Sequence, residues 1–305
     1  MSAPVTDDAE AAQADRAARA WQGPPAAAMA IGSDAHKELF CRMLLDTFNP
    51  YKPAIIDWPR LGEAERLRLV GLPIWDIAVA TEGKASTRVL GYASVVADPL
   101  LAEAIRLNGF EEGRHKQVLA NLVTAYGIEL GSEAACPAPR DAEWAFMVTG
   151  YSECIDSFFA FGLFEAARRS GYFPPALVDT FEPVMQEECR HILFFVNWAA
   201  WHRRNLPWWR KPIFATRVLA VWAFLIWERV RTAREVGGGN NFTMAGHESI
   251  GIDLDIAGLM ALCLAENDRR LAGYDTRLLR PAAVPHLTRL ALRLMRKPRR
   301  QRNGR

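Results

Sequence analysis

Apolar residues recur at helical spacing through the central part of the chain, and breaks in this pattern divide it into helices. In one such run Phe194, Phe195 and Trp198 fall on the same face, as the buried stripe of an amphipathic helix requires. Four long runs cover residues 73–95, 98–127, 141–170 and 174–204. Together they predict an all-α fold, a ferritin-like four-helix bundle with additional N- and C-terminal helices.

Shorter helices are expected on both sides of the bundle. Ser33 or Asp34 can cap a helix that runs to about residue 47, and residues 57–71 contain a second short helix. Beyond the bundle, the pattern predicts an amphipathic helix at 253–273. Pro183 lacks an amide hydrogen, so it either kinks the last long helix or marks its true start.

The predicted organisation has five parts. They are a flexible N-terminal tail at 1–30, an N-terminal helical extension at 31–72, the bundle at 73–204, an apolar C-terminal helical extension at 205–288 and a basic tail at 289–305. The first part is rich in Ala and Asp and lacks the basic and then apolar order of a signal peptide. It is therefore expected to be a tail without regular structure.

Cysteine usage narrows the class of protein. The chain has five cysteines, an odd number, and they are scattered without any Cys-x-x-Cys pair. This spacing argues against a disulfide framework, a zinc ribbon and an iron–sulfur cluster. A reducing, cytoplasmic location is expected.

The positive charge of the chain is concentrated at its C-terminal end. The net charge is +2, but residues 289–305 carry eight basic and no acidic residues, so the remainder carries 2 − 8 = −6. The apolar run at 213–227 spans roughly 23 Å as a helix, short of the roughly 30 Å hydrocarbon core of a bilayer. It is either a helix buried against the bundle or one that lies in a membrane surface. The basic end favours contact with an anionic membrane, namely the inner face of the cytoplasmic membrane. An acidic protein would also attract this basic end. Nucleic acid is not expected as a partner.

A repeated five-residue phrase carries the candidate chemistry. Glu111-Glu112-Gly113-Arg114-His115 and Glu187-Glu188-Cys189-Arg190-His191 stand 76 positions apart, and the lone glutamates Glu82 and Glu153 precede them by about 30 residues. On a helix, a Glu and a His three residues apart lie on one face, so each phrase can grip one metal ion. The surrounding positions are apolar, and buried carboxylates among apolar residues call for cations. The repeat therefore predicts a dinuclear metal site.

This pattern resembles the ferritin-like di-iron carboxylate superfamily, in its oxygen-activating branch. Acyl-carrier-protein desaturases, bacterial multicomponent monooxygenases and the aerobic magnesium-protoporphyrin ester cyclase share it. The resemblance covers roughly residues 73–204 and implies six metal ligands, namely Glu82, Glu112, His115, Glu153, Glu188 and His191. It also implies that the acids Glu111 and Glu187 orient the imidazoles, and that the arginines Arg114 and Arg190 pair with those acids.

The resemblance further implies an activity. Two iron ions, with manganese or a mixed Mn/Fe pair as alternatives, would use O₂ to hydroxylate, desaturate or otherwise oxidise an organic and hydrophobic substrate. Electrons would come from a separate reductase or ferredoxin, because the sequence has no flavin or iron–sulfur motif. No catalytic side chain is expected beyond the metal ligands, and the candidate pocket residues are Tyr92, Tyr151, Phe158 and Phe195.

Two other functions stay open from the sequence. A ferritin-like protein that oxidises and stores iron, or detoxifies peroxide, would use similar ligands; the paired arginines and the apolar extension argue against it. A membrane-associated helical scaffold without a metal is the second alternative. The complete set of six ligands argues against that one.

Overall fold

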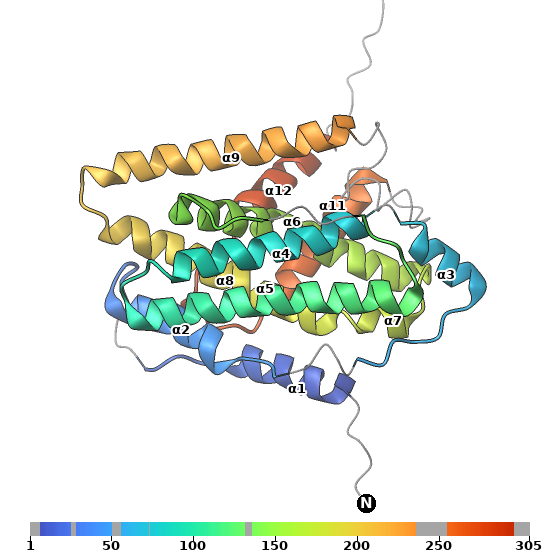
Figure 1. The fold of residues 1–305 in the computed structure, drawn as a ribbon. Coiled ribbons are helices and arrows are strands. Elements are labelled where there is room, and N and C mark those ends of the chain that lie inside the picture. Colours follow the sequence, from blue (N-terminus) through green and yellow to red (C-terminus); the bar gives the residue numbers. More distant parts are fainter. Residues whose placement is uncertain are drawn as a thin grey trace, which may run out of the picture.

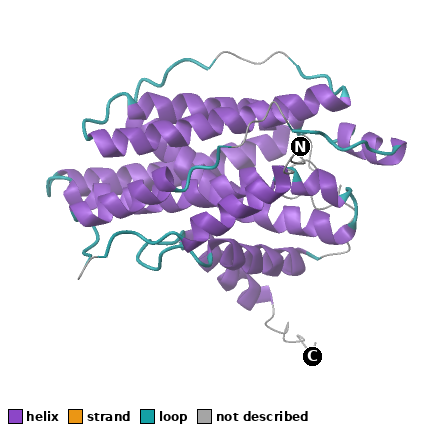
Figure 2. Cartoon of the chain, turned by 90° about the horizontal axis from the view of Figure 1, so that it is seen from below, coloured by secondary structure: helices purple, strands orange, loops and turns teal. Residues whose placement is uncertain are grey.

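The computed structural model shows an all-α protein, as the sequence predicts. It describes residues 7–25, 29–50, 56–72, 74–131, 136–235 and 255–295. Within these ranges the regular structure is entirely helical, and no strand occurs (Figure 2). The fold is therefore a packed helical bundle.

Four long helices form the centre of the molecule and agree with the four predicted runs. They are α4 (Trp75–Ala93), α5 (Pro99–Tyr126), α6 (Ala142–Ser170) and α8 (Glu182–Asn205). Local chemistry sets their ends: the Asp98 side chain accepts a hydrogen bond from the amide of Leu101, and Gly127 ends α5 with a φ of 66°. Figure 1 shows α4 and α5 lying side by side along the bundle.

The last predicted run is divided in two. A short helix, α7 (Pro175–Asp179), comes first, and α8 then begins at Glu182 with Pro183 in its first turn. A proline is tolerated there because the first amides of a helix have no partner within it. Pro183 thus marks the start of the helix and does not kink it.

Helices before and after the bundle cover its outside. Among the described residues three of them precede it, α1 (Asp7–Ala20), α2 (Asp34–Asp46) and α3 (Glu63–Val70), and three follow it, α9 (Arg210–Glu235), α11 (Ile256–Leu271) and α12 (Ala283–Met295). The side chain of Ser33 accepts a hydrogen bond from the amide of His36 and so caps α2, as expected. Within the described ranges, none of the helices combines the length and the apolar character that a membrane crossing needs.

The N-terminal part differs from the prediction. Residues Asp7–Ala20 form a helix, α1, so the expectation of a tail without regular structure is wrong for this segment. Arg19 pairs with Asp15 on the same helix at 2.8 Å and donates a hydrogen bond to the carbonyl of Ala272 at 3.0 Å. Frequent alanine, the best helix former, explains a helix with so little apolar patterning. Residues 1–6, 26–28 and 296–305 of the predicted tails lie outside the described part of the chain.

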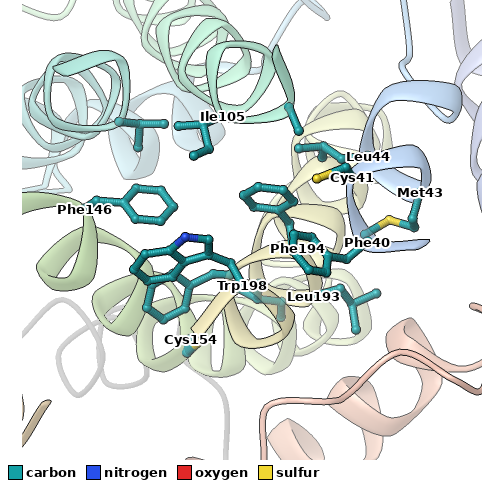
Figure 3. Packing of buried hydrophobic residues seen from close by; sticks show 14 of the residues in the cluster. Phe40, Cys41, Met43, Leu44, Ile105, Phe146, Cys154, Leu193, Phe194 and Trp198 are labelled. Carbon is teal, nitrogen blue, oxygen red and sulfur yellow. The ribbon is translucent and has the colours of Figure 1, made fainter. Parts of the chain in front are cut away.

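Buried aromatic residues fix the position of α8 in the bundle. Phe194 and Trp198 of α8 meet Phe40 of α2 and Phe146 of α6 in the main core, where Figure 3 shows them from close by. The rings of Phe146 and Trp198 are 4.7 Å apart and nearly perpendicular, and those of Phe40 and Phe194 are 5.4 Å apart. Such edge-to-face pairs favour one rotation of α8 about its axis. The same rotation turns Glu188 and His191, which lie earlier in α8, toward α5.

Candidate metal centre

Two helices bring together a compact group of side chains that could hold a metal ion. Glu112 and His115 lie on α5, and Glu188 and His191 lie on α8. One ligand atom from each of the four lies within 4.8 Å of the others. The side chains of Glu112, His115 and His191 are at most 1% exposed, and that of Glu188 is 12% exposed. The i, i+3 spacing predicted from the sequence therefore does place each pair on one helix face.

Hydrogen bonds fix which ring nitrogen of each histidine is free. The Nε2 of His115 lies 2.9 Å from Glu187 Oε2, and the Nε2 of His191 lies 2.8 Å from Glu111 Oε2. A carboxylate only accepts hydrogen bonds, so each Nε2 must carry the proton. In a neutral imidazole the Nδ1 atom then presents its lone pair. Both Nδ1 atoms face the cluster, since His115 Nδ1 lies 3.3 Å from Glu188 Oε1 and His191 Nδ1 lies 2.8 Å from Glu112 Oε1.

The orienting acids act across the bundle. Glu111 comes from the first phrase but contacts His191 of the second, and Glu187 comes from the second but contacts His115 of the first. Each of the two acids also accepts a hydrogen bond from an arginine. The bond of Arg190 to Glu111 Oε1 measures 2.9 Å, and Arg114 pairs with Glu187 Oε1. Each motif thus supplies the acid that orients the histidine of the other.

The two arginines are held by the N-terminal extension, which sequence reasoning did not connect with the site. Arg190 donates from Nε to Thr47 Oγ1 at 2.9 Å and from Nη2 to the carbonyl of Leu44 at 2.7 Å. Arg114 donates from Nη1 to the carbonyl of Asn49 at 2.7 Å. Two of these three acceptors are backbone carbonyls, which every residue carries. No sequence signal marks them.

Glu82 and Glu153 lie at the more open side of the cluster. The Oε2 atom of Glu82, on α4, is 3.7 Å from His115 Nδ1, and its side chain is 24% exposed. Glu153, on α6, is half-buried, and its Oε1 atom is buried without a hydrogen-bond partner. The Glu111 and Glu187 side chains on the opposite side are at most 1% exposed. Solvent therefore approaches the cluster from the side of α4 and α6.

A serine that sequence reasoning missed also contacts the cluster. Ser157 lies on α6, one helical turn after Glu153, and its hydroxyl donates to Glu188 Oε2 at 2.9 Å. Ser157 and Glu188 are both buried. The spacing of four residues after a candidate ligand is the signal that could have found the serine, because it puts both side chains on one face of the helix.

Crowded carboxylates shift the ionisation of the group. Burial, followed by the charge of neighbours including Glu112, raises the pKa of Glu82 to about 7, and the same causes raise the pKa of Glu153 well above its ordinary value. Burial lowers the pKa of His115, but its hydrogen bonds to carboxylates, Glu187 foremost, raise it further than burial lowers it. Without a cation, the group therefore holds extra protons to limit its negative charge.

The unpaired atoms of the cluster match the needs of a metal ion. Four buried side-chain atoms in and beside the cluster have no hydrogen bond of normal geometry, namely Glu112 Oε1, His115 Nδ1, Glu153 Oε1 and His191 Nδ1, although His191 Nδ1 and Glu112 Oε1 lie only 2.8 Å apart. Buried polar atoms are rarely left unpaired in folded proteins, and bound cations would satisfy all four. Cys154 and Cys189 follow two of the predicted ligands but belong to the hydrophobic core, so the donors are oxygen and nitrogen alone. The buried Glu/His cluster is compatible with a di-iron site.

The candidate pocket aromatics lie in the hydrophobic clusters. Tyr92 stacks on Phe146 with ring centroids 4.7 Å apart, and Phe195 meets Tyr151 edge-on at 4.8 Å. Phe158 is 1% exposed and belongs to a second cluster. Their role in binding a substrate stays a prediction.

No protein-family model, curated protein or solved structure matches this chain. The geometry of the Glu/His cluster therefore carries the functional argument.

Proposed function

We propose that the protein is an O₂-dependent di-iron oxidoreductase that oxidises an organic, hydrophobic substrate. One observation carries the proposal: two Glu-x-x-His pairs meet in a buried cluster with both free histidine nitrogens turned inward. Carboxylate and imidazole donors suit iron; manganese, or one ion of each metal, suits the same donors.

The proposed roles follow from the contacts. Glu112, His115, Glu188 and His191 would hold the ions, and Glu82 and Glu153 would add carboxylate oxygens from α4 and α6. Iron held in this way would supply the redox chemistry by which O₂ is reduced. Ser157 would keep Glu188 in one orientation through its hydrogen bond.

The acids and arginines would tune this group without touching the ions. Glu111 and Glu187 hold a proton on Nε2 of the two histidines, which leaves Nδ1 as the donor atom. Arg190 and Arg114 offset the charge of these acids in a part of the bundle closed to water. The substrate would approach from the opposite side, between α4 and α6, where Glu82 is partly exposed.

The electron balance adds a partner to the proposal. Insertion of one oxygen atom into a C–H bond turns O₂ and the substrate into an alcohol and water, and it consumes two further electrons and two protons. A reductase or ferredoxin is proposed as the source of these electrons.

Iron binding is the direct test. The metal-free, full-length protein is titrated with Fe(II) without oxygen, the bound iron is counted, and the absorbance is followed on mixing with O₂. We expect two irons per chain and a transient absorbance change. Glu112→Ala should lose both, whereas Glu103→Ala, an exposed position on the same helix, should keep both.

Two results would contradict the proposal. The absence of stoichiometric iron binding would reject the metal centre itself. Continued uptake of many irons per chain on aeration would instead favour iron storage.

A further inference from the structure

Helix α9 exposes an unusually apolar outer side. Its inner stripe, with Phe214, Val221 and Leu225, is buried against the bundle. The outer positions from the preceding turn onward are large and apolar as well: Trp208, Trp209, Ile213, Leu219, Ile226, Trp227 and Val230 are between 43% and 81% exposed. A helix on the surface of a soluble protein normally carries polar residues on that side. The outer side of α9 is therefore a contiguous apolar surface.

Ion pairs hold α9 firmly on the bundle. Near one end Arg217 binds Asp141 at 2.9 Å, and near the other Arg229 binds Asp156 at 2.7 Å. Both acids lie at or on α6, next to which α9 packs. In Figure 1 α9 forms the upper edge of the molecule. The apolar side thus faces outward from Ile213 to Val230, about 26 Å of helix at 1.5 Å per residue.

Helix α12 repeats this arrangement with more positive charge. Its outer stripe consists of Leu287, Leu290 and Leu294, each more than half exposed; Arg293 flanks this stripe, as does Arg289, which pairs with Asp268 at 3.2 Å. The sequence continues from this helix with six further basic residues and no acidic one. Figure 1 places α12 in the same upper part of the view as α9. The outer face of α9 is therefore apolar, and apolar and basic residues occur together on the outer side of α12.

We propose that the outer faces of α9 and α12 dock the protein on an anionic membrane surface. Leucine and tryptophan side chains would enter the boundary between headgroups and acyl chains, while the arginines would pair with anionic headgroups. Tryptophan suits this boundary because its ring is apolar and its N–H is polar.

The charge of this surface favours a membrane over a second copy of the chain as its partner. A two-fold contact brings the same patch of both subunits together, so a dimer through these faces would oppose the basic end of α12 to itself. An anionic bilayer complements both the charge and the apolar character of the patch. The docking does not depend on the candidate metal centre, so its test is independent of the test of the proposed oxidase activity.

Vesicle flotation tests the docking with the full-length protein. Vesicles of phosphatidylcholine alone are compared with vesicles of phosphatidylcholine and phosphatidylglycerol. We expect at least about tenfold stronger binding to the anionic vesicles, weakened by 0.5 M salt, because each basic residue near the surface contributes about 1 kcal/mol. Leu219→Glu with Ile226→Glu should lose the binding, since both residues are exposed and a charge cannot enter the boundary.

The control pair is Leu67→Glu with Val95→Glu. These residues are 63% and 65% exposed but lie away from α9 and α12, so binding should be unchanged. Quenching of tryptophan fluorescence by brominated phosphatidylglycerol gives a second readout on the unaltered protein, and we expect it to be quenched. Equal binding to both vesicles, absence of quenching, or a stable dimer in sedimentation that the α9 pair of substitutions splits would overturn the proposal.

Discussion

Replacement of Arg190 by alanine tests how far the network around the metal centre supports the fold without metal. Arg190 is 2% exposed, and its three hydrogen bonds to Glu111, Thr47 and Leu44 measure 2.7–2.9 Å. Loss of one partner of a buried ion pair costs roughly 3–5 kcal/mol, and here Glu111 would keep only His191 and, at 3.6 Å, Arg114 as partners. Each of the two remaining hydrogen bonds contributes about 0.5–1.5 kcal/mol. We therefore expect the free energy of unfolding to fall by about 4–8 kcal/mol.

Urea unfolding of the metal-free protein, followed by circular dichroism at 222 nm, measures this loss. Arg203→Ala is the matched control, since Arg203 is an exposed residue on the same helix, and it should change stability by less than about 0.5 kcal/mol. Adding Glu111→Gln to the Arg190→Ala variant should restore about 1–3 kcal/mol, because the buried charge that has lost its Arg190 partner is then gone. A loss below about 1 kcal/mol in the single variant, or strictly additive losses in the double variant, would refute this reasoning.

Three further predictions concern single residues. Ser157→Ala should weaken Fe(II) binding by about 10–100-fold in anaerobic titration, because Glu188 loses the hydrogen bond that orients it; an unchanged affinity would contradict this. Pairing with an arginine lowers the pKa of buried Asp275 to about 2, below its unfolded value near 3.9, so its stabilisation is complete above that value and is lost as the pH falls toward 2. Asp275→Asn should accordingly be less stable than the wild type at pH 6, with a difference that shrinks in acid melts. Gly150→Ala should destabilise by about 1–3 kcal/mol in urea, because its new methyl group would overlap the ring of Phe195, 2.0 Å away; full stability would show that this ring moves freely.

Most of the helices could be predicted because their signals are local. The cap at Ser33, the proline at 183 and the apolar stripes act within a turn or two of the chain, and the predicted run 73–95 became the helix Trp75–Ala93. The helix at Asp7–Ala20 was missed because its packing depends on partners more than 200 residues away, such as the carbonyl of Ala272. The high helix propensity of this segment, without an apolar stripe, did not indicate that it packs against the rest of the protein.

The candidate site divides in the same way. The Glu-x-x-His pairs are local, so their helix faces followed from the spacing, and the repeat indicated that the two faces meet. The exchange of acids between the motifs could not be predicted. A glutamate side chain is long enough to reach either histidine, and only the packing of α5 against α8 decides which one it contacts. The contribution of α2 was also hidden, since Arg190 binds the backbone carbonyl of Leu44 and any residue at that position offers the same atom.

The crossed pairing of Glu111 with His191 and of Glu187 with His115 makes the two halves of the repeat interdependent. A hairpin of α4 and α5 expressed alone would present its histidine without an acid to hold the ring, and the same is true of the second half. Under the proposed function neither half would hold metal ions by itself, and a chain interrupted between α5 and α6 would bind them only once both pieces reassociate. Metal binding would then show whether the two halves have joined correctly, in a newly made chain as in a deliberately split one.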